Sequence, residues 1–364
     1  MTEVGIVGGG LAGFSAYQTL RRGGLEPDEI VVFDPEGDPA AAWTRRARAI
    51  RQTHMRSESD GHCLPTSFPG LAVRDAVRRG SVAPLLRSVT NTYNPTVASF
   101  LAHVQDLRRR SGWDESVRAV RIDRIEAGPD GFTLGGTEVP HVLVATGHPG
   151  VSLPEELRDD PRVVHAYEPH DYAGDVTVVG AGLAAATEWV NALAAGATVI
   201  SVRRREPLRL KLNMPREWFS KRALDGYHRT TPGERAATIR ALLRPSFPPG
   251  RRFDEPLERA RAEGRFRVEP SVNGSEQVIC ATGFLRGFHH DPLLRSLVEE
   301  HEVETFEDWI ALDPDSTVPS LTDGRRTLAL AGVAGQWAFP AADTLVGAKY
   351  AARGLLSRMR CRTR

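Results

Sequence analysis

The chain of 364 residues is long enough for two or three domains, and its 41% hydrophobic and 26% charged residues are typical of a soluble globular protein. The 47 basic and 46 acidic residues nearly cancel, which argues against binding to nucleic acid or an anionic membrane, because both favour a clear basic excess. The 3 cysteines stand far apart without a CxxC pair, which excludes a dithiol redox centre and argues against a cysteine-based metal site.

The first element pattern is a strand, a glycine-rich turn and a helix in residues 4–13, VGIVGGGLAG. Gly8, Gly10 and Gly13 have the spacing GxGxxG. The first glycine permits a tight turn, the second lets the backbone approach a pyrophosphate, and the third lets the helix pack close to the strand. The next strand, EIVVFD, ends in Asp34, whose carboxylate can accept hydrogen bonds from an adenosine ribose. This unit therefore predicts a dinucleotide site.

A second unit of the same kind begins at residue 176 with VTVVGAGLAA, in which Gly180, Gly182 and Ala185 form GxGxxA. Its second strand ends in Arg203 and Arg204 where an acid would select the free 2′-hydroxyl of NAD. Arginines there can pair with the 2′-phosphate of NADP. Two such sites, one with an acid and one with arginines, predict FAD in the first unit and NADPH in the second.

An apolar strand that ends in Ala-Thr-Gly occurs twice, at 141–147 (HVLVATG) and 278–284 (VICATGF), and we expect the second to return the chain to the first domain. The simplest arrangement is an α/β protein with two Rossmann-like domains, in which the NADP domain is inserted into the FAD domain. We expect the FAD domain to comprise residues 1–150 and 276–364. Residues 151–275 would form the NADP domain, with the Pro- and Arg-rich stretch 206–270 as its elaboration.

With these motifs in place, the sequence resembles the class B flavin monooxygenases, that is, the flavin-containing monooxygenases and their N-hydroxylating and Baeyer–Villiger relatives. The resemblance covers most of the chain. Its further segments are AAW (41–43), RQTH (51–54), the lead-in to the second turn (163–182), CATGFLRGFHHDPLL (280–294) and the closing segment (328–352).

The resemblance implies an enzyme that uses NADPH to reduce FAD and oxygenates a small-molecule nitrogen, sulfur or carbonyl with O₂, through a flavin C4a-(hydro)peroxide. It adds site residues to those of the two glycine-rich turns. The residues expected near FAD are Trp43, Arg51, Thr53 and Gly332, and those expected near NADP are Thr282 and Gly283. The polar segment 44–95 would line the reaction site, where Asn91 and Asn94 are the candidate catalytic residues.

Two other functions remain open from the sequence. The first is an NADPH-dependent flavin reductase or dehydrogenase that inserts no oxygen, and the second is a flavoprotein fold kept as a binding module. Sparse cysteine and a strand-like start at Glu3, with no room for a signal peptide, predict a cytoplasmic protein. We expect no metal, nucleic-acid or membrane partner, and the pattern leaves open whether identical subunits assemble.

Overall fold

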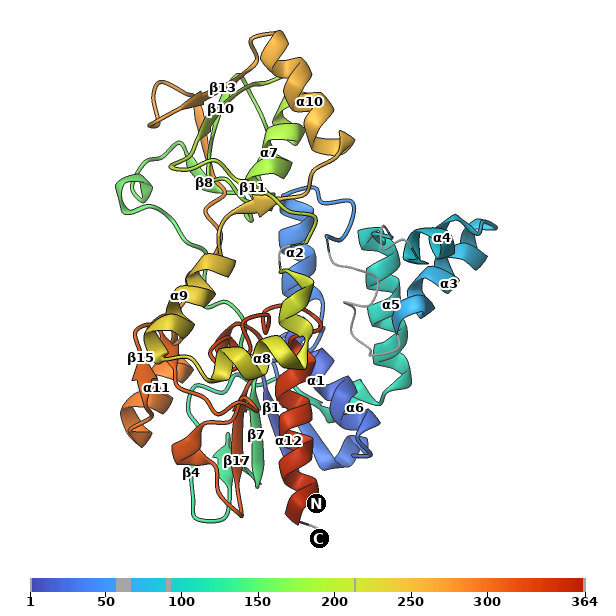
Figure 1. The fold of residues 1–364 in the computed structure, drawn as a ribbon, viewed down its shortest axis with the longest axis vertical. Helices are drawn as coiled ribbons and strands as arrows, with labels where there is room; N and C mark the ends of the chain where they lie inside the picture. The colour runs from blue at the N-terminus through green and yellow to red at the C-terminus, as the bar shows by residue number, and fades with distance from the viewer. Residues whose placement is uncertain (1, 57–66, 90–92, 213, 363–364) are drawn as a thin grey trace.

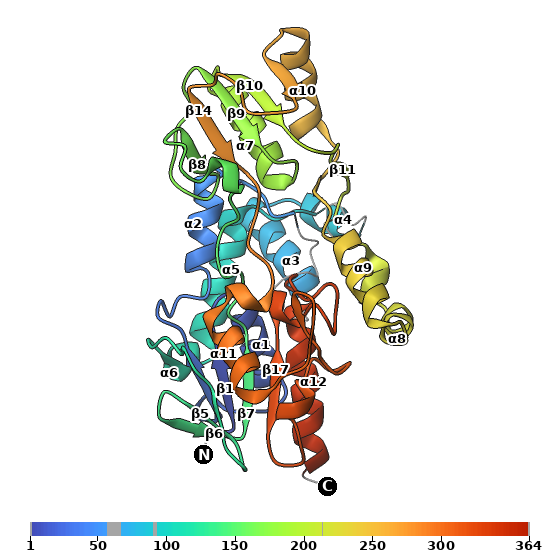
Figure 2. The same cartoon turned by 90° about the vertical axis from the view of Figure 1, so that its left-hand side faces the viewer.

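The computed structural model describes residues 2–56, 67–89, 93–212 and 214–362. They form an elongated molecule with a parallel sheet towards each end, and helix α2 (Ala41–Ala49) lies between the two sheets (Figures 1 and 2). Within this part of the chain, no helix combines the length and the apolar character that crossing a membrane requires.

The first sheet has five parallel strands in the order β17-β7-β1-β2-β3. Four of these strands are buried along their whole length, because both faces of the sheet are covered. Helices α1 (Leu11–Arg22) and α12 (Ala348–Arg362) pack on one face, and the small antiparallel sheet of residues 126–139 packs on the other with α11 (Pro292–His301). The strands are β1 (Val4–Val7), β2 (Ile30–Phe33), β3 (Val117–Arg118), β7 (His141–Val144) and β17 (Thr327–Leu330).

The second sheet also has five parallel strands, in the order β13-β10-β9-β14-β8. Helices α7 (Leu183–Ala194) and α10 (Arg251–Ala262) cover it, and the fully buried Trp189 of α7 packs in this core. The two sheets confirm the expected α/β class with two Rossmann-like units. The strands are β8 (Val163–His165), β9 (Asp175–Val179), β10 (Thr198–Val202), β13 (Phe266–Glu269) and β14 (Gln277–Cys280).

The expected boundary at residue 276 is wrong for the second Ala-Thr-Gly strand. We placed this strand in the first domain, but β14 pairs with β9 and β8 in the second sheet. The chain therefore returns to the first unit only after Cys280. The physical reason is that β14 is buried between two strands of the second sheet, where its apolar side chains complete that core.

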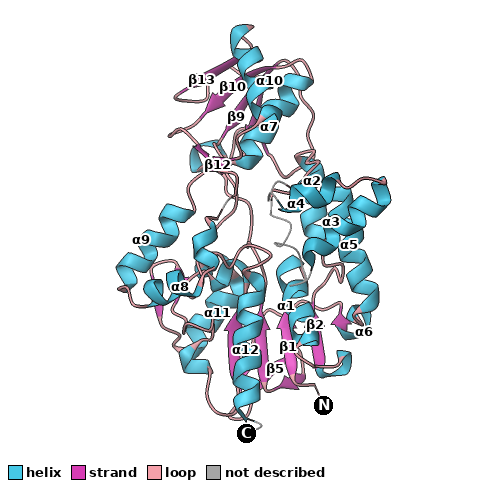
Figure 3. Ribbon diagram, turned by 45° about the vertical axis from the view of Figure 1, so that its right-hand side comes forward, coloured by secondary structure: helices cyan, strands magenta, loops and turns pink. Residues whose placement is uncertain are grey.

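The stretch 206–270 does not belong wholly to the second unit either. Helices α8 (Lys221–His228) and α9 (Pro232–Leu242) pack against the closing segment of the first unit. The Tyr227 hydroxyl donates to the Trp337 carbonyl at 3.0 Å, and a His228 ring nitrogen lies 2.7 Å from the Ala338 carbonyl oxygen. Figure 3 shows these two helices on the opposite side of the molecule from α3, α4 and α5.

The remaining elements surround these two units. The helices are α3 (Ser67–Arg79), α4 (Ala83–Val89), α5 (Val97–Arg110), α6 (Trp113–Ser116) and α11 (Pro292–His301). The short strands are β4 (Glu126–Ala127), β5 (Phe132–Leu134), β6 (Thr137–Val139), β11 (Leu208–Arg209), β12 (Ser246–Phe247), β15 (Thr305–Phe306) and β16 (Trp309–Ile310).

Candidate functional site

Both glycine-rich turns open on one cavity of about 1600 Å³ between the two sheets. Its walls come from the ends of β1 and β7 in the first unit and of β9, β10 and β14 in the second. Helix α2 and the closing segment before α12 complete the lining. Ligand sites of parallel α/β sheets lie at the carboxyl ends of the strands, which is where this cavity lies.

The first turn is shaped by contacts that only glycine permits. Gly8 has φ +97°, and a Cβ there would lie 2.5 Å from the Ala145 carbonyl oxygen. A Cβ on Gly13 would overlap the carbonyl oxygen of Gly8, so this glycine sets the close packing of α1 on β1. A Cβ on Gly10, by contrast, would meet no atom within 4 Å. Gly10 caps α1, so free helix amides and an open cradle face the cavity, which suits a pyrophosphate.

Asp34 follows β2 and lies beside this cradle. Its Oδ2 accepts the Gly9 amide at 2.8 Å, and its Oδ1 accepts the amides of Glu36 and Gly37 at 2.9 and 3.0 Å. These three bonds fix the carboxylate in place. A carboxylate has about four acceptor positions, so one remains on Oδ2 for a hydroxyl in the cavity.

The second turn repeats this geometry. Gly180 has φ +136°, and a Cβ there would overlap the Ala281 carbonyl oxygen. A Cβ on Gly182 would again meet nothing within 4 Å, and Ala185 is fully buried under the helix that Gly182 caps. The second turn therefore also presents an open cradle and free helix amides to the cavity.

The two arginines expected to bind a 2′-phosphate differ in how exposed and how paired their side chains are. The Arg203 side chain is only 7% exposed, pairs with Glu206 at 2.6 Å and lies 5.5 Å from the centre of the Trp189 ring. Arg204 is exposed at the cavity wall and has no hydrogen-bond or ion-pair partner among the residues that the structure describes. Arg204 is therefore the arginine that is free to bind an anion.

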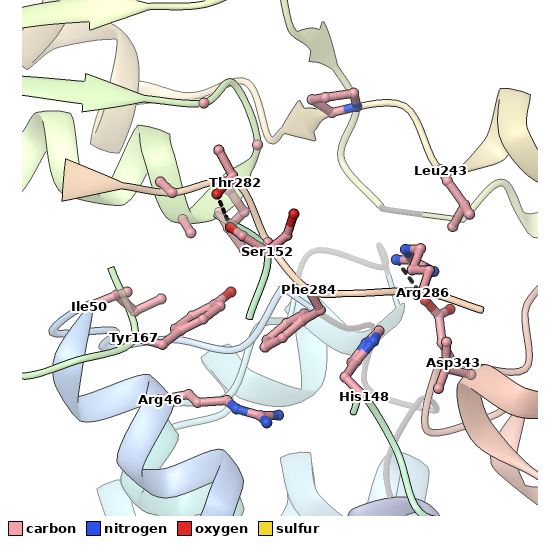
Figure 4. A pocket seen from close by; sticks show the side chains of 18 of the residues that line it. Arg46, Ile50, His148, Ser152, Tyr167, Leu243, Thr282, Phe284, Arg286 and Asp343 are labelled. Atoms are coloured by element: carbon pink, nitrogen blue, oxygen red, sulfur yellow. Dashed lines mark hydrogen bonds and ion pairs between the residues drawn. The ribbon is translucent and has the colours of Figure 1, made fainter. Parts of the chain in front are cut away.

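An aromatic stack crosses the cavity between the two turns (Figure 4). The Phe284 ring lies 4.3 Å from the His148 ring and 4.9 Å from the Tyr167 ring, with interplanar angles of 13° and 7°. The guanidinium of Arg46, from α2, lies 4.6 Å from the centre of the Phe284 ring. Such parallel stacks are favourable and largely exclude water from the space they fill.

Burial shifts the pKa of two titratable groups in the cavity in the direction that favours their neutral forms. Burial, followed by the charges of Arg286 and Arg46, lowers the pKa of His148 to about 3. Burial raises the pKa of Asp343, although Arg286 lies 3.7 Å away and partly opposes the effect. The Oδ1 atom of Asp343 has no hydrogen-bond partner within the described ranges. A neutral imidazole and a poorly solvated carboxyl therefore face the same cavity.

Most of the residues that the sequence singles out meet in this cavity, and some do not. Those that line it are Gly8, Gly10, Asp34, Trp43, Gly180, Gly182, Arg203, Arg204, Thr282, Gly283 and Gly332. Gly13 and Ala185 support the turns from behind, and Arg51 lines a smaller cavity on the other face of α2. Thr53 lines neither cavity; its carbonyl accepts the Val97 amide at 2.9 Å.

Asn94, one of the two candidate catalytic asparagines, does not line the cavity. Asn91 lies outside the described residues. The amide of Asn94 donates to the carbonyls of Met55 and Arg56 at 3.1 and 3.4 Å, which ties the end of the α2 segment to α5. The described part of the chain contains no group of three His, Cys, Asp or Glu side chains that could hold a metal ion.

Sequence reasoning missed the central side chains of the cavity. His148 and Phe284 each directly follow an Ala-Thr-Gly segment. This shared position in the repeat indicated that the two residues occupy equivalent places in the two units. Arg46 and Asp343 gave no such signal. Arg46 is one of several arginines in its helix, and Asp343 is an isolated acid in the closing segment, so neither belongs to a recognisable motif.

No model of a known protein family and no curated protein matches the sequence, but solved structures do match the fold. The ornithine N-hydroxylase KtzI of Kutzneria sp. 744, with reduced FAD, NADP⁺ and L-ornithine, has a TM-score of 0.77, 16% identity and coverage of 100% of both chains. DfoA, the cadaverine monooxygenase of Erwinia amylovora, bound to FAD, has a TM-score of 0.76 and 13% identity over 99% of this chain and 94% of that chain.

A third structure has a different activity. The bacillithiol disulfide reductase Bdr of Staphylococcus aureus has a TM-score of 0.60 and 15% identity over 100% of this chain and 99% of that chain. The chain thus has the two-unit fold that flavin-dependent N-hydroxylases share with this reductase. At such identities fold does not imply activity, so the function has to be argued from the site.

Proposed function

We propose that the protein is an FAD- and NADPH-dependent monooxygenase that transfers one oxygen atom from O₂ to a heteroatom of a small molecule, with an amine nitrogen as the first choice. The observation that carries this proposal is that two separate dinucleotide cradles open on one cavity. The sequence leaves nitrogen, sulfur and carbonyl substrates open. Two N-hydroxylases among the structural neighbours favour nitrogen.

The residues of the first unit fit FAD. The amides at the start of α1 would bind the pyrophosphate, which approaches through the space that Gly10 leaves open. The free acceptor position of Asp34 would bind an adenosine ribose hydroxyl. When bound, FAD would supply electron transfer from NADPH and the activation of O₂.

The residues of the second unit fit NADPH. Gly182 opens the cradle at the start of α7, and the exposed Arg204 follows β10 where a 2′-phosphate would lie. Arg203 would support this loop from below through Trp189 and Glu206.

The side chains between the two cradles would control water and protons. The stacked rings of His148, Phe284 and Tyr167 fill the middle of the cavity, and such a dry wall limits hydrolytic side reactions. Asp343, whose pKa is raised by burial, can hold a proton at its unpartnered Oδ1. The neutral His148 places an uncharged imidazole beside the stack, which can take part in hydrogen bonds without adding charge.

The test is product formation by the purified protein with FAD, NADPH and isotopically labelled O₂. A panel of small amines, thioethers and ketones is analysed by mass spectrometry, while NADPH oxidation and hydrogen peroxide are followed in parallel. Incorporation of one labelled oxygen atom, coupled to NADPH oxidation and absent in Gly182→Ala, supports the proposal. NADPH oxidation that yields only hydrogen peroxide or a reduced acceptor for the whole panel contradicts it.

The second candidate is an NADPH-dependent flavin reductase without oxygen insertion, which the fold shared with Bdr favours. It would not work through a protein dithiol. The sequence has no CxxC pair, and burial raises the pKa of the fully buried Cys280 to about 11. Under anaerobic conditions, rapid NADPH-dependent reduction of an added disulfide or quinone would identify this activity.

A further inference from the structure

Helix α2 separates the large cavity from a second cavity of about 720 Å³. One face of α2 lines the first cavity, and its other face lines the second together with Val151 and the segment 167–171. Only Ala42, Arg46 and Tyr167 belong to both linings. The second cavity lies away from both glycine-rich turns, so the proposed nucleotide sites do not account for it.

The charge of this cavity is strongly positive. Among the described residues, four arginines of the α2 segment line it, at positions 45, 46, 48 and 51, against one acid, Asp171. Arg45 is neutralised by Glu36, which it contacts at 2.6 and 2.7 Å. Arg51 pairs with Asp171 at 2.9 Å, but the Asp171 side chain is 98% exposed, and such pairs contribute little.

Two of the arginines have no counter-ion. Neither Arg46 nor Arg48 has a carboxylate within ion-pair distance in the described ranges of the chain. Arg46 is half-buried, and burial lowers its pKa. A half-buried cation such as Arg46 gains from an anionic partner, because its charge is incompletely solvated, whereas Arg48 is exposed to solvent.

The wall opposite α2 is rigid. The His170 ring is 2% exposed and lies between Glu188 of α7 and the Glu168 carbonyl, each at 2.8 Å. The Tyr172 hydroxyl also donates to Glu188, at 2.8 Å, and the Arg51 guanidinium lies 4.5 Å from the centre of the Tyr172 ring. These contacts hold the Arg51 side chain beside the cavity.

The backbone supports the same arrangement. Arg51 has φ +48°, which is rare for a residue other than glycine, and the Asn191 amide holds the preceding carbonyl of Ile50 at 2.9 Å. Strained residues of this kind persist only where surrounding contacts fix them, and they cluster at functional sites.

We propose that this second cavity binds a multiply charged oxyanion, a small molecule with carboxylate or phosphate groups, through Arg46, Arg48 and Arg51. Guanidinium groups bind both anions through paired N–H donors, and three arginines of this lining outnumber Asp171, the exposed acid beside them. The proposal goes beyond the proposed oxygenation and does not depend on it.

Arg46 would connect the two cavities. Its guanidinium already contacts the Phe284 ring in the first cavity, while the same side chain lines the second. An anion in the second cavity therefore competes with Phe284 for this side chain.

The test is isothermal titration of the purified full-length protein, with FAD and NADP⁺ both present in excess to occupy the two nucleotide turns. Citrate and pyrophosphate are the two probes, and the one that binds more tightly distinguishes a carboxylate ligand from a phosphate ligand. We expect saturable binding of at least one probe. Arg48→Ala and Arg51→Ala should each weaken it roughly ten-fold, the effect of losing one charge-assisted contact.

Arg353→Ala is the matched control, because Arg353 is an exposed arginine of α12 outside both cavities. Thermal unfolding of each variant checks that the fold is intact, and Arg48→Glu replaces any variant that fails this check. The proposal is overturned if neither probe binds, if binding persists unchanged in both cavity variants, or if Arg353→Ala weakens it equally.

Discussion

Replacing Gly10 with alanine tests whether the first glycine-rich turn holds a flavin dinucleotide. Gly10 has φ −63° and ψ −173°, a conformation that alanine adopts without strain. The added Cβ would meet no protein atom within 4 Å. The methyl group therefore enters the cavity and leaves the protein core unchanged.

The expected effect on stability is small. Alanine restricts the unfolded chain more than glycine, which stabilises the fold by about 0.4–1 kcal/mol. Alanine is also a poorer helix N-cap than glycine, at a cost of up to about 1 kcal/mol. These terms nearly cancel, so we expect the unfolding temperature to change by about 2 °C or less.

The expected effect on FAD binding is large, because the methyl group occupies the space through which a pyrophosphate reaches the α1 amides. Loss of one charge-assisted hydrogen bond costs about 1.5–3 kcal/mol. Gly10→Ala should therefore weaken FAD binding roughly ten- to hundred-fold, measured by quenching of flavin fluorescence during titration of the flavin-free protein.

Gly182→Ala is the matched control, since Gly182 also caps a helix and also leaves open space around an added Cβ. This variant should bind FAD as the wild type does and should lose affinity for NADPH. Unchanged FAD affinity in Gly10→Ala, or loss of FAD in Gly182→Ala, would refute the assignment of the two turns.

Three further predictions concern single residues. Arg204→Ala should weaken NADPH binding roughly ten- to hundred-fold and leave NADH binding unchanged. Arg203→Ala should mainly lower the unfolding temperature, because the Arg203 guanidinium is packed on Trp189. Titrations with both nucleotides and thermal unfolding separate the two effects. Gly13→Ala should destabilise the protein by about 3 kcal/mol or more, because its Cβ would overlap the carbonyl of Gly8, and a normal urea midpoint would contradict this packing. His148 has a pKa of about 3 in the fold against 6.5 when unfolded, so the free energy of unfolding should fall as the pH drops below 6.5, by about 2 kcal/mol at pH 5. In urea unfolding, the His148→Phe variant should lose less stability than the wild type between pH 7 and 5. Equal acid sensitivity of the two proteins would count against the buried neutral ring.

The parts of the fold that the sequence predicts well are those set by local signals. Each glycine-rich turn lies between a strand and a helix within about fifteen residues, so neighbouring residues alone determine these units. The same local signals identify Asp34 and the arginines after β10. These signals do not reveal which arginine is free to bind a phosphate. The Arg203 guanidinium packs on Trp189, a residue fourteen positions earlier on another element.

Elements whose partners are distant in the sequence were assigned less well. The apolar strand Gln277–Cys280 is equally suited to either sheet, and only tertiary packing places it beside β9. Helices α8 and α9 lie in the sequence between β10 and β13 of the second unit, but their apolar partners are in the closing segment near Trp337. Asn94 was expected in the reaction site because it is polar, yet its amide serves to hold backbone carbonyls.

The repeat itself explains why β14 lies in the second sheet. In each unit the first glycine of the turn, Gly8 or Gly180, touches the alanine carbonyl of an Ala-Thr-Gly segment, Ala145 or Ala281. This close approach requires the two strands to be neighbours in one sheet, so each Ala-Thr-Gly strand must lie beside its own glycine-rich strand. The residues that follow the two segments, His148 and Phe284, then meet and stack at 4.3 Å. The two units thus contact each other through equivalent positions. A stack of this kind contributes about 0.5–1.5 kcal/mol, far less than the hydrogen-bond ladders within each sheet.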